Sequence, residues 1–172
     1  MQGTMRAVDA LIAEMEQEAE TTRRVLERVP ENKLTWRPHP KSMTLGQLAQ
    51  HVASIFEISG FLETDGLNVD EVKFENPQPE SKAALLQTFE DGLVTARQRL
   101  GALDDRRAAQ PWKLHKSGTE VFTIPKLALM RSLLLNHWYH HRGQLSVYFR
   151  LLDVPVPVVY GRTADENPFA SA

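Results

Sequence analysis

The sequence predicts an all-α protein built as a four-helix bundle. Four long segments carry apolar residues at three- and four-residue steps, the spacing of one face of an α-helix. Short stretches marked by proline, glycine or paired aspartates separate these segments, and no stretch shows a strong strand pattern. In such bundles, binding sites are commonly built from side chains that point into the core from facing helices.

The first two predicted helices have recognisable ends. The first covers residues 4–29, and Pro30 ends it because proline cannot continue a helix. The second covers residues 44–65. Thr44 and Gln47 open it with the three-residue spacing of a capping box, in which each side chain accepts a hydrogen bond from the backbone of the other residue.

The second half of the chain supplies the other two helices. The third predicted helix covers residues 81–103, and the fourth covers 123–152 without interruption. Residues 110–122 carry a weak indication of a short strand pair, and we interpret them as a connector. An extended, proline-punctuated tail follows from about residue 154. The length suits a single domain that covers residues 1–172.

The composition excludes several classes of function. The net charge of −2 creates no field that would attract a polyanion, so nucleic acid is not an expected partner. The chain has no apolar run of about 20 residues and no signal-peptide pattern, so we expect neither a membrane span nor secretion and assign the protein to the cytoplasm. It has no cysteine, which excludes thiolate ligands and a cysteine nucleophile. Any metal must therefore be held by nitrogen and oxygen.

Three of the six histidines lie in the stretch HWYHHRGQL, residues 137–145. At 100° per residue, His141 lies on the apolar stripe of the fourth helix, and His137 lies about 40° from it. His140 points about 100° away, at the boundary of this face. On the second helix, His51 shares the face of Ile55 and the other apolar residues. The helical spacing thus directs three imidazoles inward.

These three histidines are the candidate metal ligands. A lone imidazole such as His51 on an apolar face is usually a core residue, and the HxxxH pair of His137 and His141 lacks the glutamate of a metalloprotease. Three buried imidazoles would, however, each need a hydrogen-bond partner, and one divalent ion satisfies all three. Three histidines with an open position are also the ligand set of a catalytic zinc site.

Two stretches resemble the DinB/YfiT-like family of metalloenzymes. They are VLERVPENKLTWRPHPKSMTLGQLAQHV, residues 25–52, and NHWYHHRGQLSVYFRLLDVPVPVVYG, residues 136–161. The resemblance implies a four-helix bundle with up-down-down-up connectivity and a divalent metal, zinc or nickel, bound by His51, His137 and His141. It also implies a homodimer, which is common in the family.

The resemblance and the composition favour one reaction class among three. The broader superfamily includes thiol-dependent S-transferases, and a chain without cysteine would need its sulfur nucleophile as a co-substrate. We therefore favour a metal-dependent transferase in which a low-molecular-weight thiol attacks a small-molecule substrate. The alternatives are a metal-dependent hydrolase and a noncatalytic stress-response protein with a structural metal. The sequence assigns no catalytic residue.

Residues near the histidines have two interpretations each. Arg142 and Gln144 either orient the ligands or, as we favour, are a surface arginine paired with a carboxylate and a glutamine at the core edge. Trp138 and Tyr148 either line a substrate pocket or, as aromatic residues at helical spacing usually do, pack in the core. We expect Tyr160 to pack the tail over the bundle.

Overall fold

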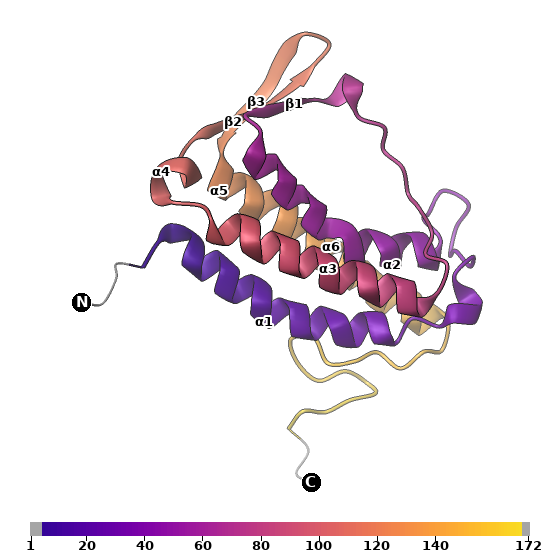
Figure 1. Cartoon of the computed structure of the whole chain (residues 1–172). Helices are drawn as coiled ribbons and strands as arrows, with labels where there is room; N and C mark the ends of the chain where they lie inside the picture. Colours follow the sequence, from indigo (N-terminus) through magenta and orange to yellow (C-terminus); the bar gives the residue numbers. More distant parts are fainter. Residues whose placement is uncertain (1–4, 170–172) are drawn as a thin grey trace.

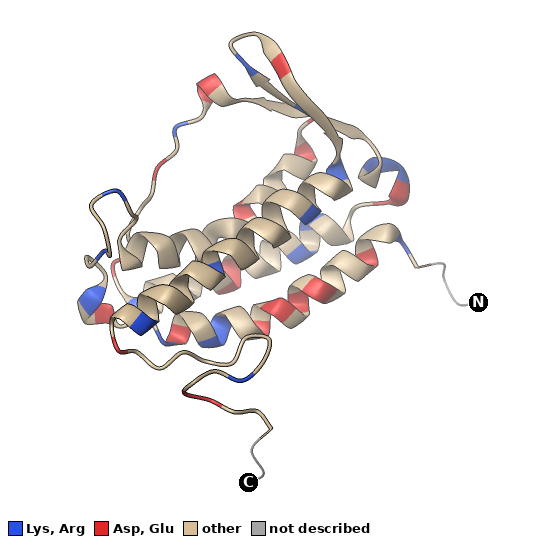
Figure 2. Cartoon of the chain, turned by 180° about the vertical axis from the view of Figure 1, so that it is seen from behind, with Lys and Arg blue, Asp and Glu red and all other residues tan. Residues whose placement is uncertain are grey.

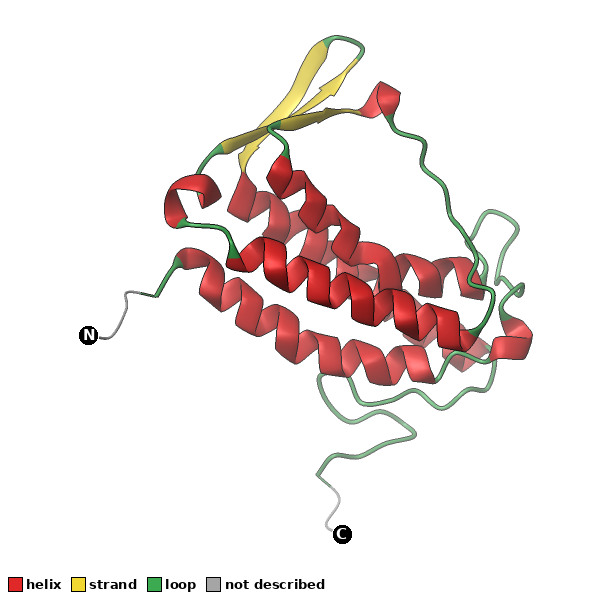
Figure 3. Ribbon diagram, in the orientation of Figure 1, coloured by secondary structure: helices red, strands yellow, loops and turns green. Residues whose placement is uncertain are grey.

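Four helical segments pack around one apolar core, and a small sheet stands at one end of them (Figures 1 and 3). The computed structural model describes residues 5–169 of the chain. Figure 1 shows α1 (Ala7–Glu27) and α6 (His137–Leu151) running in one direction, and α2 (Leu45–Ser54) and α3 (Lys82–Gly101) running in the other. The four long helical segments therefore follow one another in the predicted order.

Several shorter elements extend or connect these helices. The second segment continues from α2 as a 3₁₀-helix, and the fourth begins with a short α-helix and a π-helical stretch before α6. The elements are η1 (Glu31–Lys33), η2 (Ile55–Glu63), η3 (Val69–Glu71), α4 (Asp105–Ala108), α5 (Lys126–Leu129) and η4 (Met130–Asn136).

The start of α2 confirms the predicted capping box. The Thr44 hydroxyl accepts a hydrogen bond from the Gln47 backbone at 3.1 Å, and the Gln47 side chain accepts one from the Thr44 backbone at 2.9 Å. Both bonds satisfy backbone donors that have no partner inside the helix. This cap sets where α2 begins and hence which residues of α2 face the core.

The all-α prediction is wrong in one respect, because the structure contains a three-stranded sheet (Figure 3). The strands are β1 (Gly66–Asn68), β2 (Pro111–Lys116) and β3 (Thr119–Pro125). β2 and β3 form an antiparallel hairpin, and β1 pairs with β2 in parallel. The segment that we interpreted as a connector is therefore mainly sheet.

The hairpin has a local cause that the sequence contains. Ser117 and Gly118 form a two-residue loop between the strands, and both have positive φ angles, of 50° and 74°. This geometry belongs to the turns whose twist matches that of the two strands, and glycine favours it. Before the turn, Trp112 is buried while Lys113 is exposed, which is the alternation of a strand.

The fourth helical segment starts later than predicted and is not uniform. β3 extends to Pro125, so the helix begins at Lys126 instead of Thr123. In η4 the π-helical hydrogen bonds widen the turn, which changes the angular position of earlier residues relative to α6. As a result, Leu129 and Leu135 are buried, although an uninterrupted helix would place them roughly 120° from His141. The same spacing places Met130 and Leu134 of η4 about 20° from His141, and both are buried. The prediction of inward faces therefore holds for these residues and within α6, but it misses Leu129 and Leu135.

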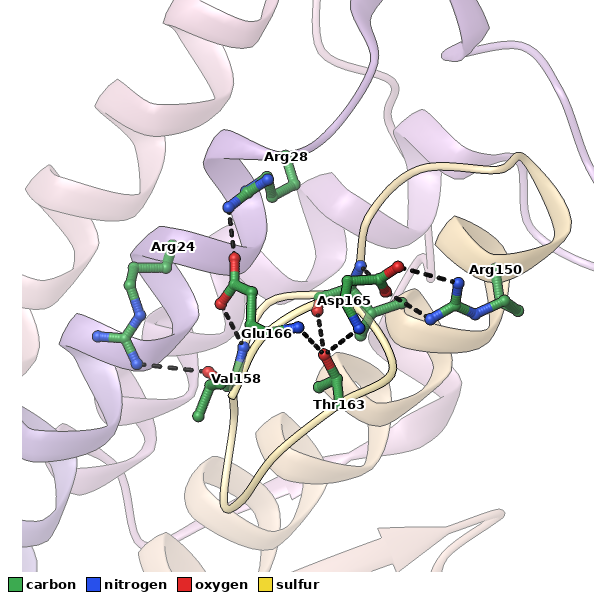
Figure 4. Close-up of polar contacts among 8 residues, drawn as sticks. Arg24, Arg28, Arg150, Val158, Thr163, Asp165 and Glu166 are labelled. Carbon is green, nitrogen blue, oxygen red and sulfur yellow. Dashed lines mark hydrogen bonds and ion pairs between the residues drawn. The ribbon is translucent and has the colours of Figure 1, made fainter. Parts of the chain in front are cut away.

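The chain beyond α6 lies against α1 and α6 and is held by two acidic residues (Figure 4). Asp165 accepts hydrogen bonds from the Arg150 side chain at 2.5 Å and from the backbone of Val156 at 2.9 Å. Glu166 accepts one from Arg28, the residue that follows α1, at 2.6 Å. These contacts attach the tail to both helices.

Several charged side chains on the outside of the helices form ion pairs with other elements. Figure 2 shows acidic residues along α1, and several of these bind arginines of other elements. Glu14 pairs with Arg131, and Glu16 pairs with Arg97 at 2.7 Å. Among the residues that the structure describes, no helix combines the length and apolar character that crossing a bilayer requires.

Candidate metal centre

The structure brings His51, His137 and His141 together. His51 lies in the last turn of α2, and the other two lie one turn apart at the start of α6. The Nε2 atom of His137 lies 3.3 Å from Nε2 of His51 and 2.7 Å from Nε2 of His141. The potential ligand atoms of all three lie within 4.8 Å of one another. These are the three residues that the helical spacing directs inward.

The environment keeps the three imidazoles neutral. Burial, together with repulsion of a positive charge by the neighbouring His141 and His137, lowers the pKa of His51 to about 4. Burial also lowers the pKa of His137 and of His141, although hydrogen bonds to the Leu133 backbone and to Gln144 offset part of the effect. A neutral imidazole has a free nitrogen lone pair, the form that binds a metal ion.

The hydrogen bond between His141 and Gln144 directs one imidazole lone pair into the cluster. His141 Nδ1 lies 2.8 Å from Gln144 Oε1, which can only accept, so Nδ1 carries the proton and Nε2 has the lone pair. This Nε2 atom lies 2.7 Å from Nε2 of His137, which in turn lies 3.3 Å from Nε2 of His51. One divalent ion bound by all three imidazoles would satisfy them together, so the residues present fit a metal ion.

The spacing of the nitrogens is also close to that of a metal site. In tetrahedral coordination with Zn–N bonds of about 2.0–2.1 Å, two ligand nitrogens lie roughly 3.3 Å apart. The His51–His137 distance of 3.3 Å matches this value, and the His137–His141 distance of 2.7 Å is shorter. A small rotation of one ring would bring the shorter pair to the same spacing.

The cluster contains imidazoles alone. Among residues 5–169, these three histidines form the one group of potential ligands that converges on a point, and no carboxylate belongs to it. Glutamates on the helices lie elsewhere: Glu16 pairs with Arg97, and Glu57 is exposed. The structure therefore places no acidic general base in the cluster.

Gln144 and Arg142 differ from the interpretations that we favoured for them. Gln144 is bonded to His141, so it contacts a candidate ligand directly. Arg142 does pair with a carboxylate, Glu18 of α1, at 2.6 Å, but it is buried rather than at the surface, with 2% of its side chain exposed. It also donates to Thr22 at 3.0 Å and to the Tyr160 hydroxyl at 2.6 Å. Sequence periodicity could not show this, because α1 and the tail supply the partners.

The aromatic residues divide between the core and the surface loop. Trp138 is fully buried and packs edge-on against Phe56, with ring centroids 4.9 Å apart, which confirms its assignment to the core. Tyr148 lies farther along α6 and donates a hydrogen bond to the Met43 carbonyl at 3.1 Å. Its ring meets Trp36 edge-on at 5.6 Å. Tyr148 thus attaches the loop before α2 to α6.

Comparison with known proteins supports the resemblance seen in the sequence. The model of the DinB family matches residues 1–168. A DinB-like protein from Bacillus subtilis superposes with a TM-score of 0.67 at 15% identity, covering 90% of this chain and 99% of that protein. A DinB-like protein from Bacillus cereus superposes with a TM-score of 0.60 at 23% identity, covering 83% and 91%. At these identities the two structures show a shared fold. No curated protein matches the sequence.

Proposed function

The chain belongs to the DinB family, and from this premise and its three convergent histidines we propose that it is a divalent-metal-dependent enzyme. The observation that supports this most strongly is the convergence of three Nε2 atoms: that of His137 lies 2.7 Å from that of His141 and 3.3 Å from that of His51. Zinc and nickel both accept neutral imidazole ligands, and three such ligands leave coordination positions for a substrate.

We propose that the reaction is the transfer of a low-molecular-weight thiol to an electrophilic small molecule. A bound divalent ion would supply the acidity that lowers the pKa of a coordinated thiol. The absence of cysteine supports a sulfur nucleophile from outside the protein. The lack of a carboxylate in the cluster supports it too, because a hydrolytic water commonly needs such a base, as in HExxH enzymes.

In the proposed reaction the thiol sulfur forms a bond to carbon. With a chlorinated substrate the carbon–chlorine bond breaks, chloride leaves and the thiol proton goes to solvent. With an epoxide a ring carbon–oxygen bond breaks, and the ring oxygen takes up a proton that replaces the one lost by the thiol. The three histidines would hold the ion, and because they are neutral the ion would keep its full positive charge. The proposed partners are therefore the thiol and the electrophile. The homodimer and the cytoplasmic location stay predictions of the family resemblance and the composition.

The test is a conjugation assay on protein loaded with zinc or with nickel. The protein is incubated with a chlorinated aromatic compound or an epoxide and with each of several low-molecular-weight thiols, and thioethers are detected by mass spectrometry. We expect a conjugate that disappears in metal-free protein and in His141→Ala. Exposed Gln98→Leu on α3 serves as the matched control.

Two other results would contradict the proposal in distinguishable ways. Turnover of esters or amides without any thiol would indicate a hydrolase. No turnover of either kind, together with a clear drop in melting temperature on metal removal, would indicate a structural metal in a noncatalytic protein.

A further inference from the structure

The side chains of three α6 residues form a hydrogen-bonded chain from the centre to the surface. His141 Nδ1 lies 2.8 Å from Gln144 Oε1, and Gln144 Nε2 lies 3.2 Å from His140 Nε2. His141 is half-buried, whereas His140 is exposed. These hydrogen bonds therefore link a proposed metal ligand to a residue in contact with solvent.

The chemistry of the Gln144 amide group decides which atoms donate and which accept in these hydrogen bonds. A glutamine side chain has one acceptor oxygen and one donor nitrogen, so its two ends cannot exchange roles without a flip. The oxygen faces His141 and requires a proton on Nδ1 of that ring. The nitrogen faces His140 and donates to its Nε2. His140 thus holds the amide in the orientation that His141 needs.

Helix geometry makes this arrangement local. Residues three and four positions apart lie on neighbouring turns of a helix, so Gln144 reaches both His141 and His140 within α6. His137 is held differently, through the Leu133 backbone. Among the described contacts of the three candidate ligands, the Gln144 bond is the one that a single side-chain substitution removes without touching the ligand set.

We propose that Gln144 is a positioning residue that holds His141 as the Nδ1-protonated tautomer, with the Nε2 lone pair directed at His137 and His51. The inference rests on the proposed metal site. Outer partners of metal-bound histidines fix the ring and its tautomer, and a carboxylate partner also raises the basicity of the ligand. A neutral amide fixes the ring without adding negative charge, so a bound ion keeps more of its acidity.

The first test uses metal-free protein and needs no activity. Long-range ¹H–¹⁵N NMR distinguishes the protonated from the unprotonated ring nitrogen of His141 in the wild type, Gln144→Leu and Gln144→Glu. We expect Nδ1–H in the wild type and in Gln144→Glu, and a mixture of tautomers in Gln144→Leu. Circular dichroism and the melting temperature establish that each variant is folded. Gln98→Leu on α3 is the control, because it removes an exposed helical glutamine away from the histidines.

The second test measures zinc affinity by competition with a chelator. Loss of an outer partner typically weakens metal binding about 10–100-fold, and we expect Gln144→Leu to lie in this range. Gln144→Glu should bind zinc as tightly as the wild type or more tightly. His140→Ala should weaken binding less than Gln144→Leu, because the amide keeps its bond to His141 in part of the population.

The outcomes separate this inference from the proposed function. An Nε2-protonated His141 in the wild type, or zinc affinity within twofold of the wild type in Gln144→Leu, would overturn the positioning role. If the wild type binds no zinc, the proposed metal site fails, and the NMR comparison alone decides whether Gln144 sets the His141 tautomer.

Discussion

His51 and His137 are separated by 86 positions in the sequence, and their Nε2 atoms lie 3.3 Å apart. The last turn of α2 and the start of α6 meet at this point, and His141 completes the cluster from the next turn of α6. In a site that joins two helices in this way, binding of an ion should require all three ligands. The consequences can be measured on purified protein.

Metal content is the most direct prediction. After dialysis against a mild chelator and exposure to zinc or nickel, we expect about one ion per chain in the wild type and a large loss in His51→Ala and in His141→Ala, because two ligands hold an ion weakly. His115→Ala should retain the metal, since His115 lies in β2 outside the cluster. Elemental analysis checks this. Full metal content in His51→Ala would show that α2 contributes no ligand.

The stability of the metal-free protein should depend on pH between about 6.5 and 4. Burial lowers the pKa of His51 from 6.5 to about 4. In this window the unfolded chain binds a proton that the folded chain does not. The free energy of unfolding therefore rises with pH, and the stability that His51 contributes at neutral pH is lost as the pH falls toward 4. Urea denaturation at several pH values measures the slope.

The matched variant for this pH dependence is His51→Gln, which should flatten the slope, whereas His115→Gln should leave it unchanged. An equally steep slope in His51→Gln would mean that other groups, such as the carboxylates, produce the dependence.

The buried ion pair between Arg142 and Glu18 should be important for stability. Removing one partner of such a pair costs roughly 3–5 kcal/mol, because the other charge stays buried without compensation. We expect about 3 kcal/mol for Arg142→Ala, since the Glu18 side chain keeps 11% exposure. The exposed pair of Arg97 and Glu16 is the control, and Arg97→Ala should cost less than about 1 kcal/mol. Equal losses in denaturant unfolding would contradict the structure.

The pairing of β1 with β2 predicts a strong effect at Gly66. A Cβ atom at this position would lie 2.5 Å from the Lys113 carbonyl oxygen, so Gly66→Ala must push the two strands apart. We expect a loss of about 1–3 kcal/mol, the usual cost of overpacking. Gly101→Ala, where a Cβ would meet nothing within 4 Å, should be neutral or slightly stabilising. Thermal unfolding compares the two, and equal melting temperatures would count against the parallel pair.

Much of the helical structure follows from local patterns. A helix places every third or fourth side chain on the same face, so apolar spacing alone indicates α1, α3 and the inward direction of His141 on α6. The Thr44–Gln47 cap likewise forms between residues three positions apart, and the structure confirms it. The Ser117–Gly118 turn was also available locally, because a Ser-Gly dipeptide commonly marks a turn.

Other features depend on contacts between distant segments and could not be predicted from spacing. β1 becomes a strand because β2, far along the chain, supplies its hydrogen bonds. Arg142 is buried because Glu18 and Tyr160 surround it, and Gln144 has a defined role because its amide meets two histidines. The sequence by itself determined which histidines point inward, since helical periodicity is local. Only the tertiary structure decided that His51 meets the other two histidines, because that depends on how α2 packs against α6.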